Sequence, residues 1–247
     1  MPAQTGRVVW TVISIFVVES MVFGLSVLPA FYFWTWTWTL TWAIPDLPLL
    51  RPAIVATTLV PAYLVFAVAL VALSALSTRV CGWRTAPDGA WKLRDLEWPL
   101  LDWSRYMIST HVVRVLVGTF FRASPLWTWY LRWNGAKIGP GVNINSLAIS
   151  DRNMLEFGDG VVIGENVHLS GHTVEGGMVK TGRVRLGRFV TVGLGSMVGI
   201  GVEAGEKVPD RRPQGGAEGV QAGGRGHLRR RPARKIDKSA PAAVVET

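Results

Sequence analysis

The chain has 247 residues, enough for one large domain or two modest ones. Charged residues make up 17% and hydrophobic residues 49% of it, whereas ordinary soluble domains carry about 25% charged residues. Because most of this deficit lies in the first third, it indicates a membrane segment rather than an unusually large soluble core. The single cysteine, Cys81, excludes an internal disulfide framework and a multi-cysteine zinc site.

The net charge of +9 is concentrated near the end of the chain. Between Lys207 and Lys238 there are ten Lys and Arg residues against three acidic ones. A net charge of this size invites a nucleic-acid or membrane-surface interpretation, but here it is a property of one unusual tail rather than of the whole chain. We therefore expect no nucleic-acid partner.

Two apolar stretches predict a transmembrane helical hairpin over residues 1–90. Val8 to Trp42 and Ala53 to Ser77 each exceed the roughly 20 residues that cross a bilayer, and prolines in the loop between them favour a helix stop. Arg51 is the only basic residue of that loop, while basic residues flank both outer ends. The positive-inside rule then predicts a multi-pass protein of the inner or plasma membrane, with both termini and the following domain in the cytoplasm.

Two features of the first apolar stretch need an explanation. Glu19 either contacts a partner helix or a polar lipid-linked substrate, or is protonated and bonded within the hairpin. The second reading is favoured because neither span offers a basic partner. The segment Trp34 to Trp42 alternates Trp and Thr almost throughout, like a strand, but an open strand is excluded from lipid. We interpret it as an interfacial aromatic belt at the end of the first helix.

Residues 91–134 predict a connector of amphipathic helices. Apolar residues recur at helical spacing between Arg105, Arg114, Arg122 and Arg132. Such helices either lie in the cytoplasmic headgroup region, with their arginines facing anionic lipid, or pack on the following domain. His111 lies in this apolar stretch, and we interpret it as structural.

A six-residue repeat begins at Ile138 and predicts the domain at 135–208. An aliphatic or aromatic residue, or once an alanine, is followed by Gly or another small or polar residue at nine positions, which begin at Ile138, Ile144, Phe157, Ile163, Leu169, Leu186, Val192, Val198 and Ala204. Three such hexads, about 18 residues, form one turn of a narrow triangular coil whose apolar residues point to the axis. The following Gly is expected to serve backbone geometry that would penalise a side chain. Each coil buries its apolar corner only by stacking on neighbours.

These hexads resemble those of the hexapeptide-repeat acyltransferases. The segment Arg132 to Gly139 is similar to the start of their β-helix, and Pro232 to Ile236 resembles the close near their C-terminus. The run from Gly164 to Glu175, continued through Leu186 to Gly199, resembles a membrane-linked branch that includes the C-terminal region of poly-lysine synthetases and terminal domains of non-ribosomal peptide synthetases. The resemblance implies a left-handed parallel β-helix, a homotrimer and an acyl-coenzyme A or acyl-carrier thioester as donor.

The hexads are interrupted between Leu169 and Leu186, where we expect a loop or extended turn that projects from the coil. In the resembling enzymes such a projection carries a histidine at the groove between two subunits. Acyl transfer to a hydroxyl or amine needs a general base with a pKa near neutrality, and histidine fits. We assign this role to His172 first and His168 second, with Glu175 as the carboxylate that orients the ring. A purely structural role for both histidines stays open.

Four cations near this interruption are candidates for the phosphates of coenzyme A or a carrier arm: Lys180, Arg183, Arg185 and Arg188. An ordinary solvated face explains them equally well. No metal is expected, because His168 and His172 alone do not complete the three ligands of a catalytic zinc site. A site like that of the γ-class carbonic anhydrases, which share this fold, is therefore a weak alternative.

After Glu206 the repeat stops, and residues 209–247 form a basic tail. It is either a disordered tail or the product of two compensating frameshifts. In the second case, segments beginning at Asp210 and His227, read one base later, restore hexad-like text, and the last coil and its cap are damaged.

The sequence therefore predicts a membrane-bound acyltransferase that moves an acyl group, such as acetyl, to a hydroxyl or amine. The main alternative is non-catalytic: a trimeric membrane scaffold, or a fragment of a peptide synthetase.

Overall fold

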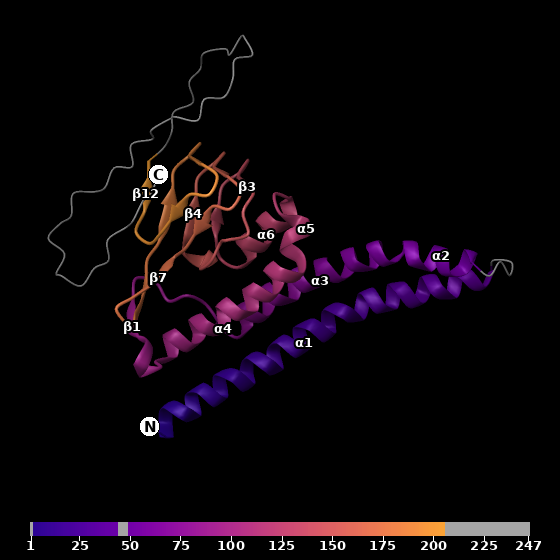
Figure 1. The fold of residues 1–247 in the computed structure, drawn as a ribbon, viewed down its shortest axis with the longest axis horizontal. Helices are drawn as coiled ribbons and strands as arrows, with labels where there is room; N and C mark the ends of the chain where they lie inside the picture. Colours follow the sequence, from indigo (N-terminus) through magenta and orange to yellow (C-terminus); the bar gives the residue numbers. More distant parts are fainter. Residues whose placement is uncertain (1, 44–48, 206–247) are drawn as a thin grey trace, which may run out of the picture. The chain divides into compact units, whose positions relative to one another are not determined.

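The computed structural model describes residues 2–43 and 49–205. The loop expected around Pro45 lies partly outside these residues, and the basic tail with its proposed frame change lies wholly outside them. The chain divides into two compact units (Figure 1). The first comprises Met1–Ala86 and Trp91–Asn134 and is helical, whereas the second comprises Pro87–Ala90 and Gly135–Thr247 and carries the strands. The protein thus mixes helix with small sheets.

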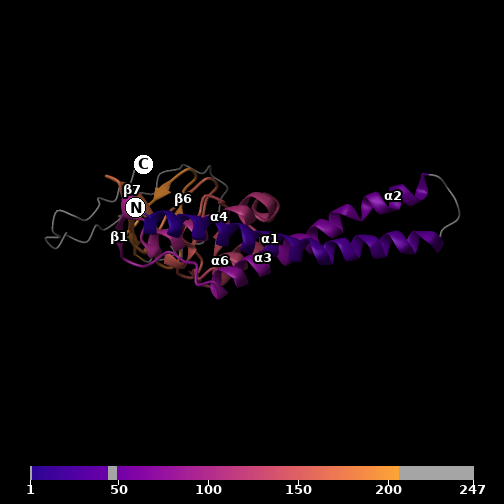
Figure 2. The ribbon, with the colours of Figure 1, turned by 90° about the horizontal axis from the view of Figure 1, so that it is seen from below.

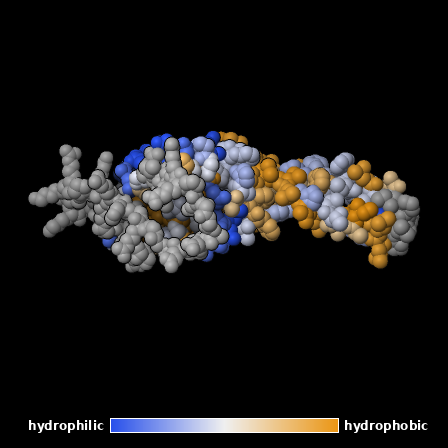
Figure 3. Space-filling model, turned by 90° about the horizontal axis from the view of Figure 1, so that it is seen from above, coloured by the Kyte–Doolittle hydropathy of each residue, from blue (hydrophilic) through white to orange (hydrophobic). Residues whose placement is uncertain are grey.

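The first unit is built on two long apolar helical segments. Helix α1 (Pro2–Leu40) ends in a 3₁₀ turn at Thr41–Ala43, and α2 (Leu50–Thr57) leads into α3 (Leu59–Val80). Figure 2 shows α1 and α3 running alongside one another. The segments Gln4–Ala43 and Leu50–Val80 have mean hydropathies of 2.1 and 2.4, and both are long and apolar enough to span a membrane. Apolar residues such as Phe16, Phe31 and Leu64 are exposed on these segments, and Figure 3 shows hydrophobic surface on the helical unit.

The alternating Trp and Thr residues belong to the helix. Thr35, Thr37 and Thr39 each donate their hydroxyl hydrogen to the backbone carbonyl three residues earlier, at 3.1, 2.7 and 2.7 Å. Threonine hydroxyls bonded in this way need no partner outside the helix. A pattern typical of a strand is therefore compatible with a helix in apolar surroundings.

The connector forms four short helical segments of the same unit. They are α4 (Trp98–Val113), a π-helical turn η3 (Arg114–Gly118), α5 (Thr119–Phe121) and α6 (Pro125–Trp133), and they follow a 3₁₀ turn η2 (Leu93–Asp95). The Ser124 hydroxyl caps α6 by accepting from the Trp127 N–H. The sequence leaves open whether the connector's arginines face lipid or the connector packs on the following domain; Arg105 is buried within the helical unit and bonded to Asp102 and Ser14.

The described residues of the second unit form three small parallel sheets. The first has the order β12-β9-β4-β2, the second β10-β5-β3, and the third pairs β11 with β6. Their strands are β2 (Lys137–Ile138), β3 (Asn143–Ile144), β4 (Leu155–Phe157), β5 (Val162–Ile163), β6 (His168–Leu169), β9 (Val184–Leu186), β10 (Thr191–Val192), β11 (Met197–Val198) and β12 (Glu203–Ala204). An antiparallel hairpin, β7 (His172–Glu175) with β8 (Met178–Thr181), adds to these, and β1 (Ala90–Lys92) lies at the boundary of the two units.

The hexad leaders are the residues that stack in these sheets. Ile138, Phe157, Leu186 and Ala204 are register partners in the first sheet. Ile144, Ile163 and Val192 are partners in the second, and Leu169 and Val198 in the third. The leaders from Ile144 to Leu186 are buried, with Ile163 and Leu169 at 0% exposure, whereas Ile138 and the leaders of the last described turn are half-buried. Burial of the leaders is thus confirmed from Ile144 to Leu186.

The geometry at the second-position glycines penalises a side chain, as expected, but through close approach to the next turn rather than through positive φ. The second-position glycines Gly158 and Gly164 do not have positive φ. A Cβ on Gly158 would lie 2.7 Å from the Arg188 backbone nitrogen of the next turn, so the missing side chain permits close stacking. Positive φ occurs instead at the fourth position, as in Asn166 and Phe189. The fourth hexad position thus requires a left-handed backbone conformation, whereas the second requires a residue small enough for the next turn to approach.

Replacing Gly158 by Ala should therefore destabilise the protein, because the new methyl group meets backbone rather than a flexible side chain. We expect about 1–3 kcal/mol, as for other overpacked sites, measured as a lower unfolding temperature in detergent. Gly193→Ala is the matched control, since its nearest described neighbour would be the Ser196 Oγ at 3.8 Å. Equal losses in the two variants would contradict this role for Gly158.

Candidate functional site

His172 lies at the start of the antiparallel hairpin that interrupts the hexads. It opens β7, and its register partner is Thr181 at the end of β8. The expected projection is therefore a two-stranded hairpin, whose turn is formed by Gly176 and Gly177 at positive φ. Gly89 reinforces its base: its amide donates to the Thr181 hydroxyl at 3.0 Å, and the Thr181 amide donates to its carbonyl at 2.9 Å.

The carboxylate in contact with His172 is that of Asp151. Its Oδ2 lies 2.5 Å from the Nδ1 of His172. The Asp151 side chain is completely buried, whereas the His172 ring keeps 19% of its surface exposed. A buried carboxylate without a hydrogen-bonded partner is costly. Because breaking the contact would leave Asp151 without the His172 partner, the contact holds the histidine ring in this orientation. Ser170 adds a second contact, with its Oγ 3.2 Å from the same Nδ1.

The chain reaches this geometry through an irregular link between hexads. Asp151 has a φ of +51° and precedes a 3₁₀ turn, η4 (Arg152–Met154). The Met154 amide donates to the Asp151 carbonyl at 2.7 Å and closes this turn. A Cβ on Gly171 would lie 2.8 Å from the Cβ of Asp151, so glycine before His172 lets the two segments approach.

Glu175 does not take the role that we expected for it. It lies three residues after His172 on the same strand, and residues an odd number apart point to opposite faces. Its carboxylate is 63% exposed and lies 3.6 Å from the Nζ of Lys180 across the hairpin. Asp151 occupies the place beside the imidazole, and no spacing in the sequence pairs it with His172.

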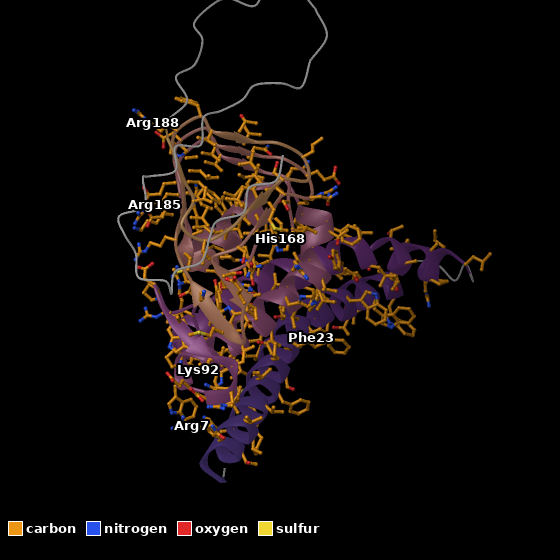
Figure 4. The ribbon with its side chains drawn as sticks, turned by 60° about the vertical axis from the view of Figure 1, so that its left-hand side comes forward. Arg7, Phe23, Lys92, His168, Arg185 and Arg188 are labelled. Carbon is orange, nitrogen blue, oxygen red and sulfur yellow. The ribbon has the colours of Figure 1, made fainter. Side chains whose placement is uncertain are left out.

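His168 lies apart from this arrangement. It is exposed on β6, where its register partner is Met197. Figure 4 shows its position on the strand unit together with Arg185 and Arg188. No hydrogen bond or ion pair joins it to Asp151 or His172, so the structure does not link the two histidines. His111 contacts Arg114 in the first unit, and His227 is outside the described residues.

Two of the four candidate cations belong to a row of ion pairs across the first parallel sheet. Glu156 on β4 lies 3.0 Å from Lys137, 2.9 Å from Arg183 and 3.2 Å from Arg185. Arg185 also reaches Glu203 on β12 at 2.6 Å. We name this set, Lys137, Glu156, Arg183, Arg185 and Glu203, the ionic row. Arg183 and Arg185 are thus committed to carboxylates, while Arg188 is exposed beyond the row (Figure 4).

The ionic row also changes the acidity of Glu156. The hydrogen bond from Lys137, with those from Arg183 and Arg185, holds the pKa of the Glu156 carboxyl below its usual value. The guanidinium of Arg185 has its pKa raised by Glu203 and Glu156 in turn.

Within the described ranges 2–43 and 49–205, no group of three or more His, Cys, Asp or Glu side chains is arranged to hold a metal ion. No protein-family model, curated protein or solved structure matches the chain. The geometry of Asp151, Ser170 and His172 is therefore the basis for any function assigned to this unit.

Asp151 and His172 should be energetically coupled. We expect a double-mutant cycle with Asp151→Asn and His172→Gln to give a coupling of about 1–3 kcal/mol, because a hydrogen bond to a charged group contributes about that much. The measurement is the unfolding of the full chain in detergent by urea. Glu175→Gln with His172→Gln is the matched control pair and should be additive; coupling there, and none with Asp151, would contradict the contact.

Glu156→Gln should weaken the protein in a pH-dependent way. A carboxyl with a depressed pKa stabilises the fold above its unfolded pKa, near 4.5, and loses this contribution as the pH falls through the folded value. We expect a loss of about 1 kcal/mol at pH 7 that shrinks below pH ~4.5, since partly exposed ion pairs contribute little. Unfolding temperatures of both proteins between pH 3 and 7 measure it, and a pH-independent difference would refute the effect.

Proposed function

We propose that the protein is a membrane-anchored acyltransferase of the hexapeptide-repeat type, with His172 as the general base. The observation that supports this most is the contact between the buried Asp151 carboxylate and His172 Nδ1. Acyl transfer needs a histidine base that is oriented by a carboxylate. His172 lies in the hairpin of the strand unit, where the hexad pattern is interrupted. The resemblance of the hexads to those of known acyltransferases supports the same reaction class.

Each residue then has a defined task. The carboxylate of Asp151 keeps the proton of the imidazole on Nδ1 and stabilises the ring when it becomes charged, and Ser170 supports the same orientation. Nε2 accepts the proton of the acceptor's hydroxyl or amine while its oxygen or nitrogen attacks the thioester carbonyl. The new ester or amide bond forms, the carbon–sulfur bond breaks, and the imidazolium returns its proton to the departing thiolate.

The proposed fold of the second unit is a left-handed parallel β-helix. Its support is the stacking of hexad leaders in three parallel sheets and the positive φ at the fourth position of the hexads. A solenoid of this kind buries its core only by stacking. We further propose a homotrimer, in which the hairpin of one subunit faces its neighbour. Val174, Phe189 and Met197 are exposed apolar residues of this unit that suit such a contact.

The donor in this proposal is acyl-coenzyme A or an acyl-carrier thioester. The four cations Lys180, Arg183, Arg185 and Arg188 remain the candidates for its phosphates, and binding the donor would then compete with the ion pairs that Lys180, Arg183 and Arg185 make with carboxylates. The two apolar segments support an anchor in the inner or plasma membrane. The distribution of basic residues supports cytoplasmic termini and a cytoplasmic strand unit.

The alternative is a non-catalytic membrane scaffold or a fragment of a peptide synthetase. One observation favours it: three of the four expected donor cations are engaged in ion pairs, Arg183 and Arg185 with Glu156 and Lys180 with Glu175. On this view the contact between Asp151 and His172 braces the hairpin and has no chemical task.

Replacing His172 by Ala decides between the two proposals. We expect thiol release from acetyl-coenzyme A, with a membrane lipid extract supplying the acceptor, to fall about 100-fold or more, as for the loss of a general base. His111→Ala is the matched control and should keep the wild-type rate. Unchanged turnover in His172→Ala eliminates this base, a loss confined to His168→Ala transfers the role to that residue, and no release by the wild type favours the scaffold.

A further inference from the structure

Helices α1 and α4 of the first unit meet along a seam of polar side chains. The Arg7 guanidinium carbon lies 5.7 Å from the centre of the Trp98 ring, and Arg105 Nε donates to Ser14 Oγ at 3.0 Å. One turn further along α4, the Ser109 hydroxyl lies beside the Glu19 carboxyl of α1. These pairs progress in the same direction along both helices, so α1 and α4 run parallel through the seam.

Arg105 is held firmly at the centre of this seam. Its side chain is 5% exposed, and its Nη1 donates to Asp102 Oδ1 at 2.6 Å. Its guanidinium carbon lies 5.9 Å from the centre of the Trp83 ring and 5.6 Å from that of Trp98. Cation–π contacts and the ion pair therefore fix the plane of the guanidinium.

Three polar atoms of the seam have no hydrogen-bond partner of standard geometry among the described residues. They are Arg105 Nη2, Ser109 Oγ and Glu19 Oε1, and each is buried. A buried polar group without a partner is costly, more so when it is charged. The Glu19 side chain as a whole is only half-buried, so one end of the seam is accessible from the surface of the unit.

From this arrangement we propose that Arg105, Ser109 and Glu19 bind the headgroup of phosphatidylethanolamine. A phosphate oxygen accepts from Arg105 Nη2 and from the Ser109 hydroxyl, and the ammonium group donates to Glu19. The proposal rests on the membrane anchor of the proposed function but not on its acyl transfer. It gives Glu19 a role different from the protonated residue expected above.

The position of the seam fits a headgroup. Trp83 lies just after the end of α3, and Trp98 opens α4. Basic residues gather around the same ends: Arg7, Arg79, Arg84, Lys92 and Arg94. Trp and basic residues concentrate at the depth of lipid headgroups. Phosphate suits a preoriented guanidinium, and a carboxylate beside it selects a headgroup that also carries N–H donors.

The ammonium distinguishes phosphatidylethanolamine from phosphatidylcholine, whose quaternary nitrogen has no N–H group. The test uses the full chain extracted in detergent and mixed with the two lipids at equal concentration and with identical acyl chains. Native mass spectrometry then counts the lipids retained. We expect the wild type to retain phosphatidylethanolamine in about tenfold preference. Equal retention of both lipids, or retention of neither, overturns the proposal.

Two variants, Glu19→Gln and Ser109→Ala, change side-chain atoms that lack a hydrogen-bond partner. They therefore leave the contacts that hold Arg105 in place. Glu19→Gln should reduce the lipid preference about tenfold, and Ser109→Ala by a smaller factor. Glu97→Gln, at an exposed position before α4, and Ser104→Ala, whose hydroxyl already bonds the Leu100 carbonyl, are the matched controls and should keep it. A preference that survives in Glu19→Gln rejects the site.

The experiment separates the site from the other proposals. Retention is measured without acyl donor, so a protein inactive in acyl transfer still reports lipid binding. Membrane fractionation of the wild type at alkaline pH tests the anchor independently. Protein that stays in the membrane fraction but shows no lipid preference disproves the seam site alone, whereas protein released without detergent disproves both the anchor and the site.

Discussion

The strand unit depends on one constraint, the in-register stacking of equivalent residues in parallel strands. Neighbouring strands in a sheet lie about 4.8 Å apart, so whatever occurs at one hexad position meets the same position of the next turn. Apolar leaders such as Ile163 then fill the interior, and the backbone beside Gly158 approaches the following turn. Irregular segments are tolerated only where they leave the stacked pairs untouched.

The candidate site arises from two such irregular segments. One lies between Ile144 and Phe157 and carries Asp151, and the other lies between Leu169 and Leu186 and carries His172. The leaders that flank each interruption, Ile144 and Phe157 for the first and Leu169 and Leu186 for the second, keep their register with the neighbouring turns. The scaffold therefore brings together a carboxylate and an imidazole that are 21 residues apart in the sequence, and the regular turns carry no part of this contact.

The sequence alone is sufficient for the periodic parts of this structure and insufficient for the rest. The positions of the leaders and of the projection at His172 follow from hexad spacing, and the two apolar helices follow from their length. Asp151 escaped prediction because its contact depends on a positive φ and a 3₁₀ turn that no periodicity encodes. Glu175 is near His172 in the sequence, but the two residues share strand β7 at an odd spacing, which places their side chains on opposite faces. Arg105 is similar: its burial depends on the packing of α4 against α1, which an amphipathic pattern does not specify.

Residues 87–90 have a consequence for the architecture of the chain. This short segment leaves the helical unit after Ala86, joins the strand unit and returns at Trp91. Gly89 exchanges two hydrogen bonds with Thr181, the residue opposite His172. The strand unit is therefore discontinuous in sequence: a fragment that begins at Gly135 keeps the β7–β8 hairpin but lacks the segment that hydrogen-bonds to Thr181 at its edge. An insertion in the linker after α3 would therefore disturb the hairpin at Thr181 and with it the position of the His172 imidazole, although the linker and His172 lie far apart in the sequence.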